Sequence, residues 1–386
     1  MNIIVVGGGF GGVKAALELS KRHIGKITLI SDEAYFLHHA TLYATATGKD
    51  MSESVIPLAD IFENAPNVTI VKDRMISLDP ERRLVIGKAK QYHYDQLVIA
   101  IGSVTTFFNI NGMAKHAFGI KSLDEIRDFH NHIQKEVVED KLDKEYFIIG
   151  AGPTGVELAG ALNQYLKHLV SVHHLKNSRA RVTLVEAAPR ILPRLSKTAA
   201  KIVGKRLKSL GIKVLTNHKV EALDDDHITI EGKTLSTTTA IWTSGVANNE
   251  FFAKHAHLFH LAPNGRVNVS PYLEAFPRVF VIGDNNTVKH SGMAWPAIYQ
   301  GKFVAKHLAR VATKRPHAAF HTHSVMCGMP IGERWGYVEW LGVYVSGLAG
   351  SWVRRWMELY GYQQLVPRKK ARQIWRAHDI PEIDAE

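Results

Sequence analysis

Residues 3–12 read IIVVGGGFGG, an apolar β-branched run that stops at glycines, and helical apolar spacing follows over 13–19. The glycines satisfy GxGxxG, and a second strand pattern comes at 27–30. Between a strand and a helix, such glycines permit a tight turn, close approach of the backbone to a pyrophosphate, and close helix packing. The stretch predicts a mononucleotide-binding unit whose candidate residues are Gly7, Gly9, Phe10, Gly11 and Gly12.

The same order of elements recurs further along the chain. A second GxGxxG loop over 150–155 follows a strand pattern at 146–149 and precedes a helix pattern at 156–169 and a strand at 182–185. A proline suits this loop, because the first N–H groups of a helix have no helical acceptor. The repeat predicts an α/β fold with two Rossmann-like dinucleotide-binding domains. The second set of candidates is Gly150, Gly152, Pro153, Thr154 and Gly155.

Other strand patterns complete each unit. They lie at 68–71, 83–86 and 96–101 after the first loop, and at 212–215, 227–230 and 239–242 after the second. No low-complexity linker separates the units, so motif positions set the boundaries. We expect a discontinuous first domain over 1–112 and 250–325, a second domain over 113–249, and a C-terminal segment over 326–386.

An acidic residue at the end of the second strand of such a unit accepts hydrogen bonds from a ribose 2′-hydroxyl and repels a 2′-phosphate. Glu186 fits this role in the second unit, although it lies further beyond the loop than usual, and it favours NADH over NADPH. Arg190 nearby moderates that preference. Asp32 is the candidate in the first unit, with a solvated turn acid as the alternative interpretation.

Two further motifs, taken with the loops, resemble the two-dinucleotide-binding-domain flavoproteins, in which the first loop binds FAD and the second binds NAD(P)H. One is the hydrophobic run that ends in Ala100-Ile101-Gly102, similar to the ATG motif of these proteins, and the other is Gly283-Asp284. The resemblance implies that Asp284 hydrogen-bonds the ribityl chain of FAD. It also implies that the following helix points its positive end at the flavin. Ala100, Gly102, Gly283 and Asp284 therefore join the FAD-binding candidates.

Within this superfamily, the chain is most similar to the type II NADH dehydrogenases. The similarity is carried by Gly155-Val156-Glu157-Leu158, by residues 182–193, and by Trp242-Thr243-Ser244-Gly245-Val246. It implies that Glu157 lies near the nicotinamide and the flavin and handles protons. It also implies that Ser244 and Gly245 lie beside NADH.

Members of that family commonly carry a quinone-side segment with two glutamines, roughly AQxxxxQG, which corresponds here to residues 294–302. Gln300 is retained, whereas Trp295 occupies the first glutamine position. We expect Trp295, Ala297, Tyr299 and Gln300 to line the electron-acceptor side, with Glu157 and Gln300 as the catalytic residues. A second departure is Ser31, where many relatives carry an acid for the FAD adenosine ribose, and Asp32 or Glu33 is the expected substitute.

Composition narrows the possible functions. The 386 residues are 46% hydrophobic, which excludes disorder, and 48 Lys+Arg against 36 Asp+Glu give a net charge of +12. That charge makes a nucleotide, a nucleic acid or an acidic lipid a possible anionic partner, but the sequence has neither a nucleic-acid motif nor a metal-site spacing among its 21 histidines. Cys327 is the only cysteine, which excludes disulfide reductases and sulfide:quinone reductases because both need paired cysteines.

The C-terminal segment carries an amphipathic helical pattern. Its apolar stripe is Leu348, Trp352, Trp356 and Leu359, with Val353, Met357 and Tyr360 beside it, whereas Arg354, Arg355 and Glu358 fall elsewhere. A basic flank suits an anionic membrane surface, and it consists of Arg354, Arg355, Arg368, Lys369, Lys370, Arg372 and Arg376. The uncharged run over 340–353 is too short to span a bilayer. The alternative is a helix that packs on its own protein or forms a homodimer interface.

Together these features predict a peripheral enzyme on the cytoplasmic face of the cell membrane, with FAD as its cofactor and no signal peptide. NADH would pass a hydride to flavin N5, and two electrons would then reach a membrane quinone without proton pumping. A soluble FAD-dependent NADH reductase of a small electron-carrier protein is the alternative. A non-turnover, NADH-sensing flavoprotein is a third possibility.

Overall fold

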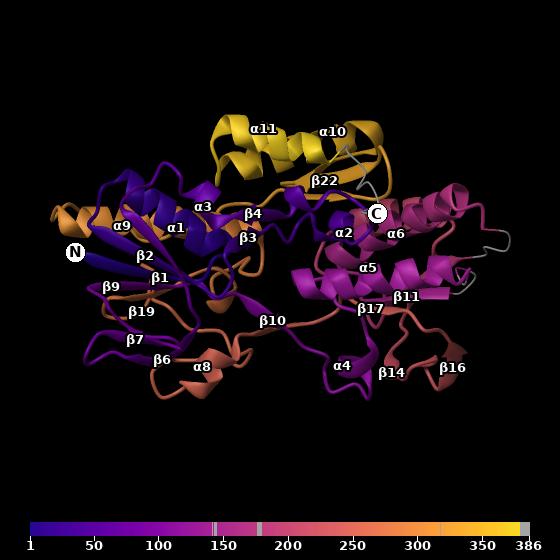
Figure 1. The fold of residues 1–386 in the computed structure, drawn as a ribbon, viewed down its shortest axis with the longest axis horizontal. Helices are drawn as coiled ribbons and strands as arrows, with labels where there is room; N and C mark the ends of the chain where they lie inside the picture. The colour runs from indigo at the N-terminus through magenta and orange to yellow at the C-terminus, as the bar shows by residue number, and fades with distance from the viewer. Residues whose placement is uncertain (141, 143–144, 176–179, 317, 379–386) are drawn as a thin grey trace.

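Two sheets, each mostly parallel, organise the chain and lie side by side, and the C-terminal segment crosses above both (Figure 1). The computed structural model describes residues 1–140, 142, 145–175, 180–316 and 318–378. Both predicted Rossmann-like units are present, and the α/β fold is confirmed.

The first sheet has six strands in the order β19-β20-β9-β1-β2-β5, and only β19 is antiparallel to its neighbour. Helices α1 and α9 cover one face, and the antiparallel sheet β6-β7-β8 covers the other. The bounds are β19 Glu274–Phe276, β20 Val279–Val281, β9 Gln96–Ile99, β1 Asn2–Val6, β2 Lys26–Ser31, β5 Val68–Lys72, α1 Phe10–Lys21, α9 Ala294–Ala312, β6 Met75–Asp79, β7 Leu84–Gly87 and β8 Gln91–His93.

The second sheet repeats this plan with four parallel strands in the order β13-β12-β11-β17. Three helices cover one face, and the antiparallel sheet β14-β15-β16 covers the other. The bounds are β13 Lys213–Thr216, β12 Arg181–Glu186, β11 Glu145–Ile149, β17 Ala240–Trp242, α5 Leu123–Val138, α6 Pro153–Val172, α7 Lys197–Ser209, β14 Val220–Leu223, β15 His227–Ile230 and β16 Lys233–Ser236.

Two short strands carry the chain between the sheets. The chain leaves the first sheet along β10 (Ser103–Thr105) and returns along β18 (Val246–Asn248), and these strands pair with each other antiparallel. The predicted boundaries at 112 and 250 lie a few residues beyond this ribbon and remain a prediction.

Smaller elements connect the first sheet to the rest of the molecule. The chain from β2 to β5 forms the hairpin β3–β4 and three short helices, and η2 follows β20. Helices α4 and α8 lie on either side of the second unit in sequence. The bounds are β3 Tyr35–Leu37, β4 Val55–Pro57, α2 Leu42–Thr45, η1 Met51–Glu53, α3 Leu58–Ile61, α4 Met113–His116, α8 Glu250–Lys254 and η2 Gly283–Asn285.

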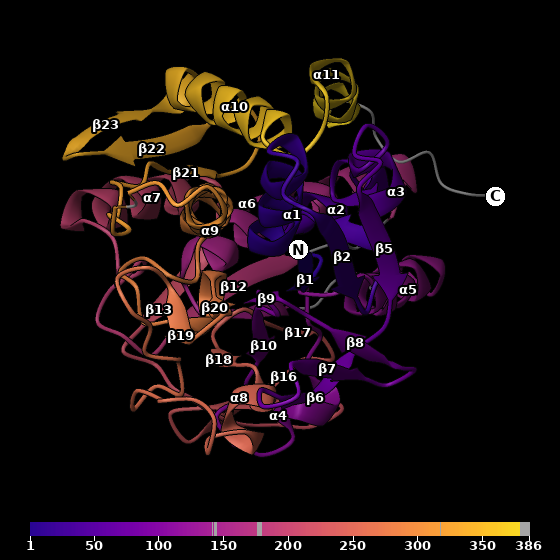
Figure 2. The same cartoon turned by 90° about the vertical axis from the view of Figure 1, so that its left-hand side faces the viewer.

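The C-terminal segment forms a layer of its own (Figure 2), with strands β21 (Cys327–Pro330), β22 (Gly336–Trp340) and β23 (Val343–Ser346) and helices α10 (Gly347–Gln363) and α11 (Arg368–Ala377). The predicted amphipathic helix is present, but Arg354, which the prediction placed in the basic flank for a membrane surface, is buried. Arg354 and Glu358 face inward and are buried, whereas Trp352 and Trp356 are exposed. Within the described residues, no helix combines the length and the apolar character that crossing a bilayer requires.

The burial of Arg354 and Glu358 has a physical cause, because the two charges are paired. Arg354 Nη1 lies 2.8 Å from Glu358 Oε1, and Arg355 Nη1 lies 3.0 Å from Glu358 Oε2. Arg354 Nε also donates to the carbonyl of Gly328 at 2.9 Å. Leu359, predicted on the apolar stripe, instead packs partly buried against the core of the first domain.

Candidate active site

The first glycine loop joins β1 to α1 and is packed on one side and open on the other. Gly7 has φ +114°, and a Cβ there would collide with the carbonyl oxygen of Ala100. A Cβ at Gly12 would collide with the carbonyl oxygen of Gly7, whereas no described atom lies within 4 Å of the position of one at Gly9. The backbone at Gly9 can therefore approach a ligand at the start of α1, where N–H groups lack helical acceptors.

The second glycine loop, between β11 and α6, repeats this arrangement. Gly150 has φ +107°, and a Cβ there would lie 2.7 Å from Cα of Ser244. A Cβ at Gly155 would collide with the carbonyl oxygen of Gly150, and the position at Gly152 is open to described atoms for 4 Å. Both loops thus fit a dinucleotide pyrophosphate, and Ser244 packs against the second loop.

The other predicted residues around the glycine loops lie in the loops or close to them. Phe10 is the first residue of α1, and its ring meets Phe36 edge-on at 4.9 Å. Pro153 and Thr154 begin α6 and are exposed. A Cβ at Gly245 would lie 2.6 Å from the carbonyl oxygen of Thr106, so Gly245 allows close passage of the linking ribbon.

The two predicted ribose acids lie in different surroundings. Glu186 ends β12, and its two carboxylate oxygens accept hydrogen bonds from the N–H groups of Ala151 and Ala188, both at 2.8 Å. It therefore lies at the second glycine loop despite its long sequence spacing.

Asp32 departs from the prediction, because β2 ends one residue earlier, at Ser31. A Cβ at Gly8 would collide with Ser31 Oγ, so Ser31 is the residue that touches the first loop. The Asp32 side chain is 54% exposed and pairs with Arg74 at 3.2 Å.

The Gly283-Asp284 motif lies at the carboxyl ends of β20 and β9. Asp284 Oδ2 accepts a hydrogen bond from Ser103 Oγ at 2.7 Å. Asn285 holds the backbone of Gly102 from both sides, because its Oδ1 accepts from the N–H at 3.0 Å and its Nδ2 donates to the carbonyl at 2.7 Å. Gly102 and Gly283, both predicted FAD-binding residues, are thus brought together with Asp284. The predictions missed Ser103 and Asn285.

The four predicted acceptor-side residues of α9 divide into two pairs. Gln300 is fully buried, and its Oε1 accepts from the Gly283 N–H and from Asn286 Nδ2, both at 2.8 Å. Ala297 is also buried beside Gly283. Its Oε1 thus fixes the Gly283 turn, whereas its buried Nε2 has no hydrogen-bond partner among the described residues, and the role of Gln300 at an acceptor surface stays a prediction.

The second pair faces the C-terminal layer. The ring of Trp295 stacks on Tyr360 of α10 with centroids 5.3 Å apart, and Tyr299 lies 5.9 Å from Trp295. Trp295 and Tyr299 therefore lie where α9 meets the exposed aromatic face of α10.

Glu157 lies on α6 and is buried, with a relative exposure of 8%. Desolvation raises the pKa of its carboxyl to about 8, against the influence of Arg354 and with a smaller contribution from Glu358. Burial and the nearby Glu157 also raise the pKa of the Cys327 thiol to about 11, so this thiol stays protonated at neutral pH. The arrangement gives Glu157 a carboxyl that can exchange a proton near neutral pH.

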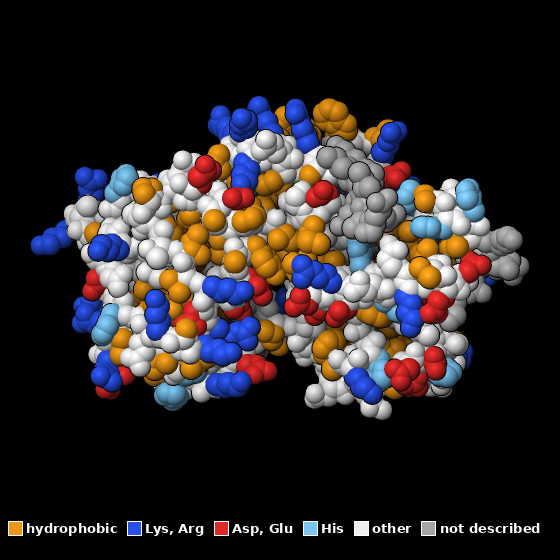
Figure 3. Space-filling view, in the orientation of Figure 1, with side chains coloured by type: hydrophobic (Ala, Val, Ile, Leu, Met, Phe, Trp, Pro, Cys, Tyr) orange, Lys and Arg blue, Asp and Glu red, His pale blue; other side chains and the backbone are white. Residues whose placement is uncertain are grey.

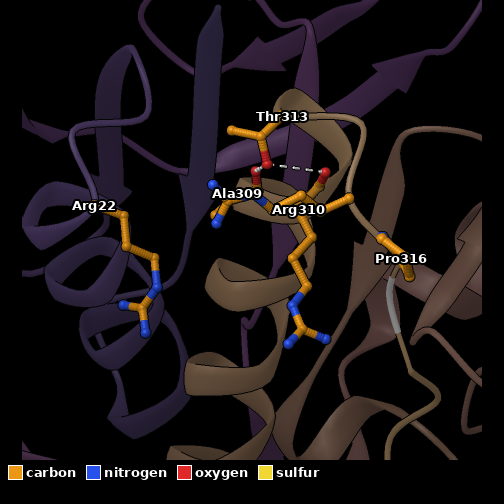
Figure 4. A pocket seen from close by; sticks show the side chains of 6 residues that line it. Arg22, Ala309, Arg310, Thr313 and Pro316 are labelled. Atoms are coloured by element: carbon orange, nitrogen blue, oxygen red, sulfur yellow. Dashed lines mark hydrogen bonds between the residues drawn. The ribbon is translucent and has the colours of Figure 1, made fainter.

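A surface depression lies away from the glycine loops, and the described side chains offer no metal site. An open depression of about 620 Å³ lies at the C-terminal ends of α1 and α9 (Figure 4), about 18 Å along α1 from the glycine loop. It includes Arg22, which is ion-paired with Glu18. Across the described ranges, no group of three or more His, Cys, Asp or Glu side chains could hold a metal ion.

Comparison with known proteins places these features in a family. The family model described as pyridine nucleotide-disulphide oxidoreductase matches residues 1–301. The type II NADH:quinone oxidoreductase Ndh of Mycobacterium tuberculosis is 30% identical over 331 residues, covering 78% of this chain and 71% of that protein. The type II NADH:quinone oxidoreductase of Staphylococcus aureus is 26% identical over 332 residues, covering 80% and 82%.

Solved structures share the fold. NDH2 from Plasmodium falciparum in complex with NADH superimposes with a TM-score of 0.83 at 18% identity, covering 98% of this chain and 97% of that one. The sulfide:quinone oxidoreductase of Aquifex aeolicus gives a TM-score of 0.80 at 19% identity, covering 96% and 92%. At these identities the likeness concerns the fold alone.

Proposed function

Because the chain belongs to the pyridine nucleotide-disulphide oxidoreductases and, within them, to the type II NADH:quinone oxidoreductases, we propose that it uses bound FAD to oxidise NADH and to reduce a quinone. The observation that carries the proposal is the pair of equivalent glycine loops, each packed on one side and open on the other. One dinucleotide is the cofactor and the other is the substrate, and the loops orient them on adjoining domains.

The residues that would hold each dinucleotide follow from the two loops. FAD supplies an acceptor for the hydride of NADH and passes two electrons to the quinone when it is bound. The first loop with Ala100, Gly102, Gly283 and Asp284 would hold FAD. The second loop with Glu186, Ser244 and Gly245 would hold NADH, with Glu186 favouring a free 2′-hydroxyl.

Glu157 is the residue we assign to proton handling. Quinone reduction to a quinol consumes two protons along with two electrons, so a proton-exchanging group near the site is required. The carboxyl of Glu157, with its pKa raised to about 8, holds a proton at neutral pH and can release it when the local charge changes. Gln300 is a positioning residue in this scheme, because it holds Gly283 and Asn286.

The C-terminal layer is the surface we propose for membrane attachment. Large apolar side chains that a soluble protein would bury are exposed on α10, and they are Leu348 (66%), Trp352 (69%), Trp356 (61%) and Tyr360 (54%). The tip of the β22–β23 hairpin continues the same surface with Leu341 (72%) and Val343 (75%). We call these six side chains the apolar face. The exposure of these side chains on α10 and on the hairpin that packs against it favours an apolar partner.

The distribution of charge supports a lipid surface as that partner. Figure 3 shows Lys and Arg side chains along the upper edge of the molecule, over α10 and α11, with hydrophobic side chains between them. Arg368, Lys369, Arg372 and Arg376 are exposed on α11. Each basic residue near an anionic leaflet contributes about 1 kcal/mol. We therefore propose peripheral attachment to the cytoplasmic face of the cell membrane, with a homodimer through the apolar face as the competing occupant.

Activity is tested with purified protein carrying FAD. NADH oxidation is followed with a menaquinone analogue and with a ubiquinone analogue, and NADPH serves as the comparison. We expect turnover with NADH and at least one quinone. Flavin that NADH reduces but that no quinone reoxidises would favour the alternative, a soluble reductase of a small electron-carrier protein, or the non-turnover NADH sensor.

Attachment is tested by co-sedimentation with vesicles of phosphatidylcholine containing phosphatidylglycerol. Wild-type protein is compared with a Trp352→Glu, Trp356→Glu double variant and with the control Val138→Glu, whose side chain is 85% exposed on α5 of the second domain. We expect the double variant alone to lose binding. Equal binding of all three proteins would refute attachment through the apolar face, and concentration-dependent association of wild type without vesicles would favour the dimer.

A further inference from the structure

A lysine of the second domain reaches across the linking ribbon into the first. Lys121 directly precedes α5, and a capping box fixes this position, because Ser122 and Glu125 bond reciprocally to each other's backbone N–H. The Lys121 N–H also donates to Glu125 Oε2 at 2.5 Å. Its side chain extends away from the helix, and Nζ donates to the Ser103 carbonyl at 2.6 Å and to Ser103 Oγ at 3.2 Å.

Ser103 connects Lys121 to the proposed flavin site. Its hydroxyl donates to Asp284 Oδ2 at 2.7 Å, so Lys121, Ser103 and Asp284 form one chain of polar contacts between the two domains. The surrounding protein desolvates the ammonium group and lowers the pKa of Lys121, while Asp284 and Glu125 act in the opposite direction. A charge in such a place is less screened than one on the surface.

Asp284, the last group in this series of polar contacts, lies where the two dinucleotides must meet. Asp284 and Gly102 lie beyond the carboxyl ends of β20 and β9, which is the ligand-binding edge of an open parallel sheet. His39 lies near the same charges, because Lys121 lowers and Asp284 raises the pKa of its imidazole, after desolvation as the largest influence. Its side chain is nevertheless accessible to solvent. Solvent therefore has access to the largely enclosed region around His39 at the junction of the domains.

We propose that Lys121 is a positioning residue for flavin reduction, whose ammonium group holds Ser103 and Asp284 in place and favours the reduced flavin by its positive charge. This inference rests on the proposed function, because it requires FAD at the first loop. Transfer of the hydride from C4 of NADH leaves NAD⁺ and puts two electrons and one proton on the flavin. The flavin thereby gains one negative charge, which the nearby Lys121 cation stabilises and which the Asp284 carboxylate, without that cation, would destabilise.

A purely structural role for Lys121 leads to a different prediction. If Lys121 only joined the domains, its loss would lower stability without changing the reduction equilibrium of the flavin. The reduction potential therefore separates the two roles, whereas loss of activity alone would not.

The test measures the midpoint potential of bound flavin by anaerobic equilibration with a reference dye, using absorbance. Lys121→Met and Lys121→Gln remove the charge, and Lys121→Arg retains it. The control is Lys135→Met, since the Lys135 side chain is 74% exposed on α5 and its nearest carboxylate is 3.9 Å away. All proteins are first checked for FAD content and thermal unfolding.

We expect both neutral variants to shift the reduction equilibrium at least tenfold toward oxidised flavin, which is 29.6 mV for a two-electron couple. Lys121→Arg and Lys135→Met should remain close to wild type. Unchanged potentials in the neutral variants, or loss of FAD from both, would overturn the proposal and leave Lys121 as a tether. Wild-type protein without NADH-reducible FAD would overturn the proposed function itself.

Discussion

Replacement of Glu157 by glutamine should change how the stability of the protein depends on pH. Burial raises the pKa of this carboxyl to about 8 from its ordinary value of 4.5, a difference of about 3.5. At 1.36 kcal/mol per unit, this corresponds to about 5 kcal/mol as an order of magnitude. The buried amide of Gln has no comparable proton equilibrium.

The sign follows from proton binding. Between pH 4.5 and 8, the folded protein retains the Glu157 proton while the unfolded chain releases it, so the folded state binds more protons. The contribution of Glu157 to the free energy of unfolding is therefore complete below about pH 4.5 and is lost as pH rises through 8. Wild type should lose up to about 5 kcal/mol relative to Glu157→Gln between pH 4.5 and 9.

The assay is denaturant unfolding of both proteins at pH 5, 7 and 9, with FAD in excess and salt constant. Glu81→Gln, an exposed glutamate in the turn between β6 and β7, is the matched control and should show a difference from wild type that is small at every pH. If the difference between wild type and Glu157→Gln is the same at pH 5 and pH 9, the reasoning about a buried, protonated Glu157 is wrong.

Three further changes test other parts of the structure. Arg354→Met should destabilise the protein by about 3 to 5 kcal/mol because it leaves the buried Glu358 unpaired, and a double Arg354→Met, Glu358→Met variant should recover most of this in denaturant unfolding. A double variant that recovers none of the lost stability would contradict the pairing of Arg354 with Glu358. Gly155→Ala should reduce NADH binding at least tenfold with FAD content unchanged, because the new Cβ collides with the Gly150 carbonyl; simultaneous loss of FAD would show that the loops are not independent. Glu186→Gln should lower kcat/KM for NADH by about 10- to 100-fold, as expected for a lost hydrogen bond to a charged group, and narrow the preference over NADPH. An unchanged NADH to NADPH ratio would remove Glu186 from the ribose site.

The fold was largely predictable because its signals are local. The patterns at 3–6, 13–19 and 27–30 lie within β1, α1 and β2, and the repeat at 146–149, 156–169 and 182–185 lies within β11, α6 and β12. Buried parallel strands are continuous apolar runs, and the glycines mark the turns that follow them. A sequence pattern of this kind depends on few long-range contacts.

The site was less predictable because its key contacts join distant residues. Ser103 of the linking ribbon donates a hydrogen bond to Asp284, and Lys121 of the other domain donates to Ser103. Neither contact leaves a periodic trace in the sequence. Ser31 rather than Asp32 reached the first loop because the strand ended one residue earlier than the acid required.

The C-terminal helix shows a different limit. Periodicity correctly separated the aromatic stripe of α10 from Arg354 and Glu358, but it could not say which side faces the protein. The prediction counted Arg354 among the basic residues that face a membrane, whereas Arg354 lies inside, paired with Glu358 and hydrogen-bonded to Gly328. Tertiary contacts with Gly328 and the first domain decide the orientation, and they leave Trp352 and Trp356 exposed.

The central claim is that one bound flavin connects NADH to a quinone, and anaerobic titration tests it most directly. FAD-loaded protein receives one equivalent of NADH and then one equivalent of a menaquinone analogue, while flavin absorbance is recorded. The account predicts complete bleaching by the first addition and complete recovery on the second. Bleaching without recovery with any quinone, or no bleaching by NADH, would contradict it.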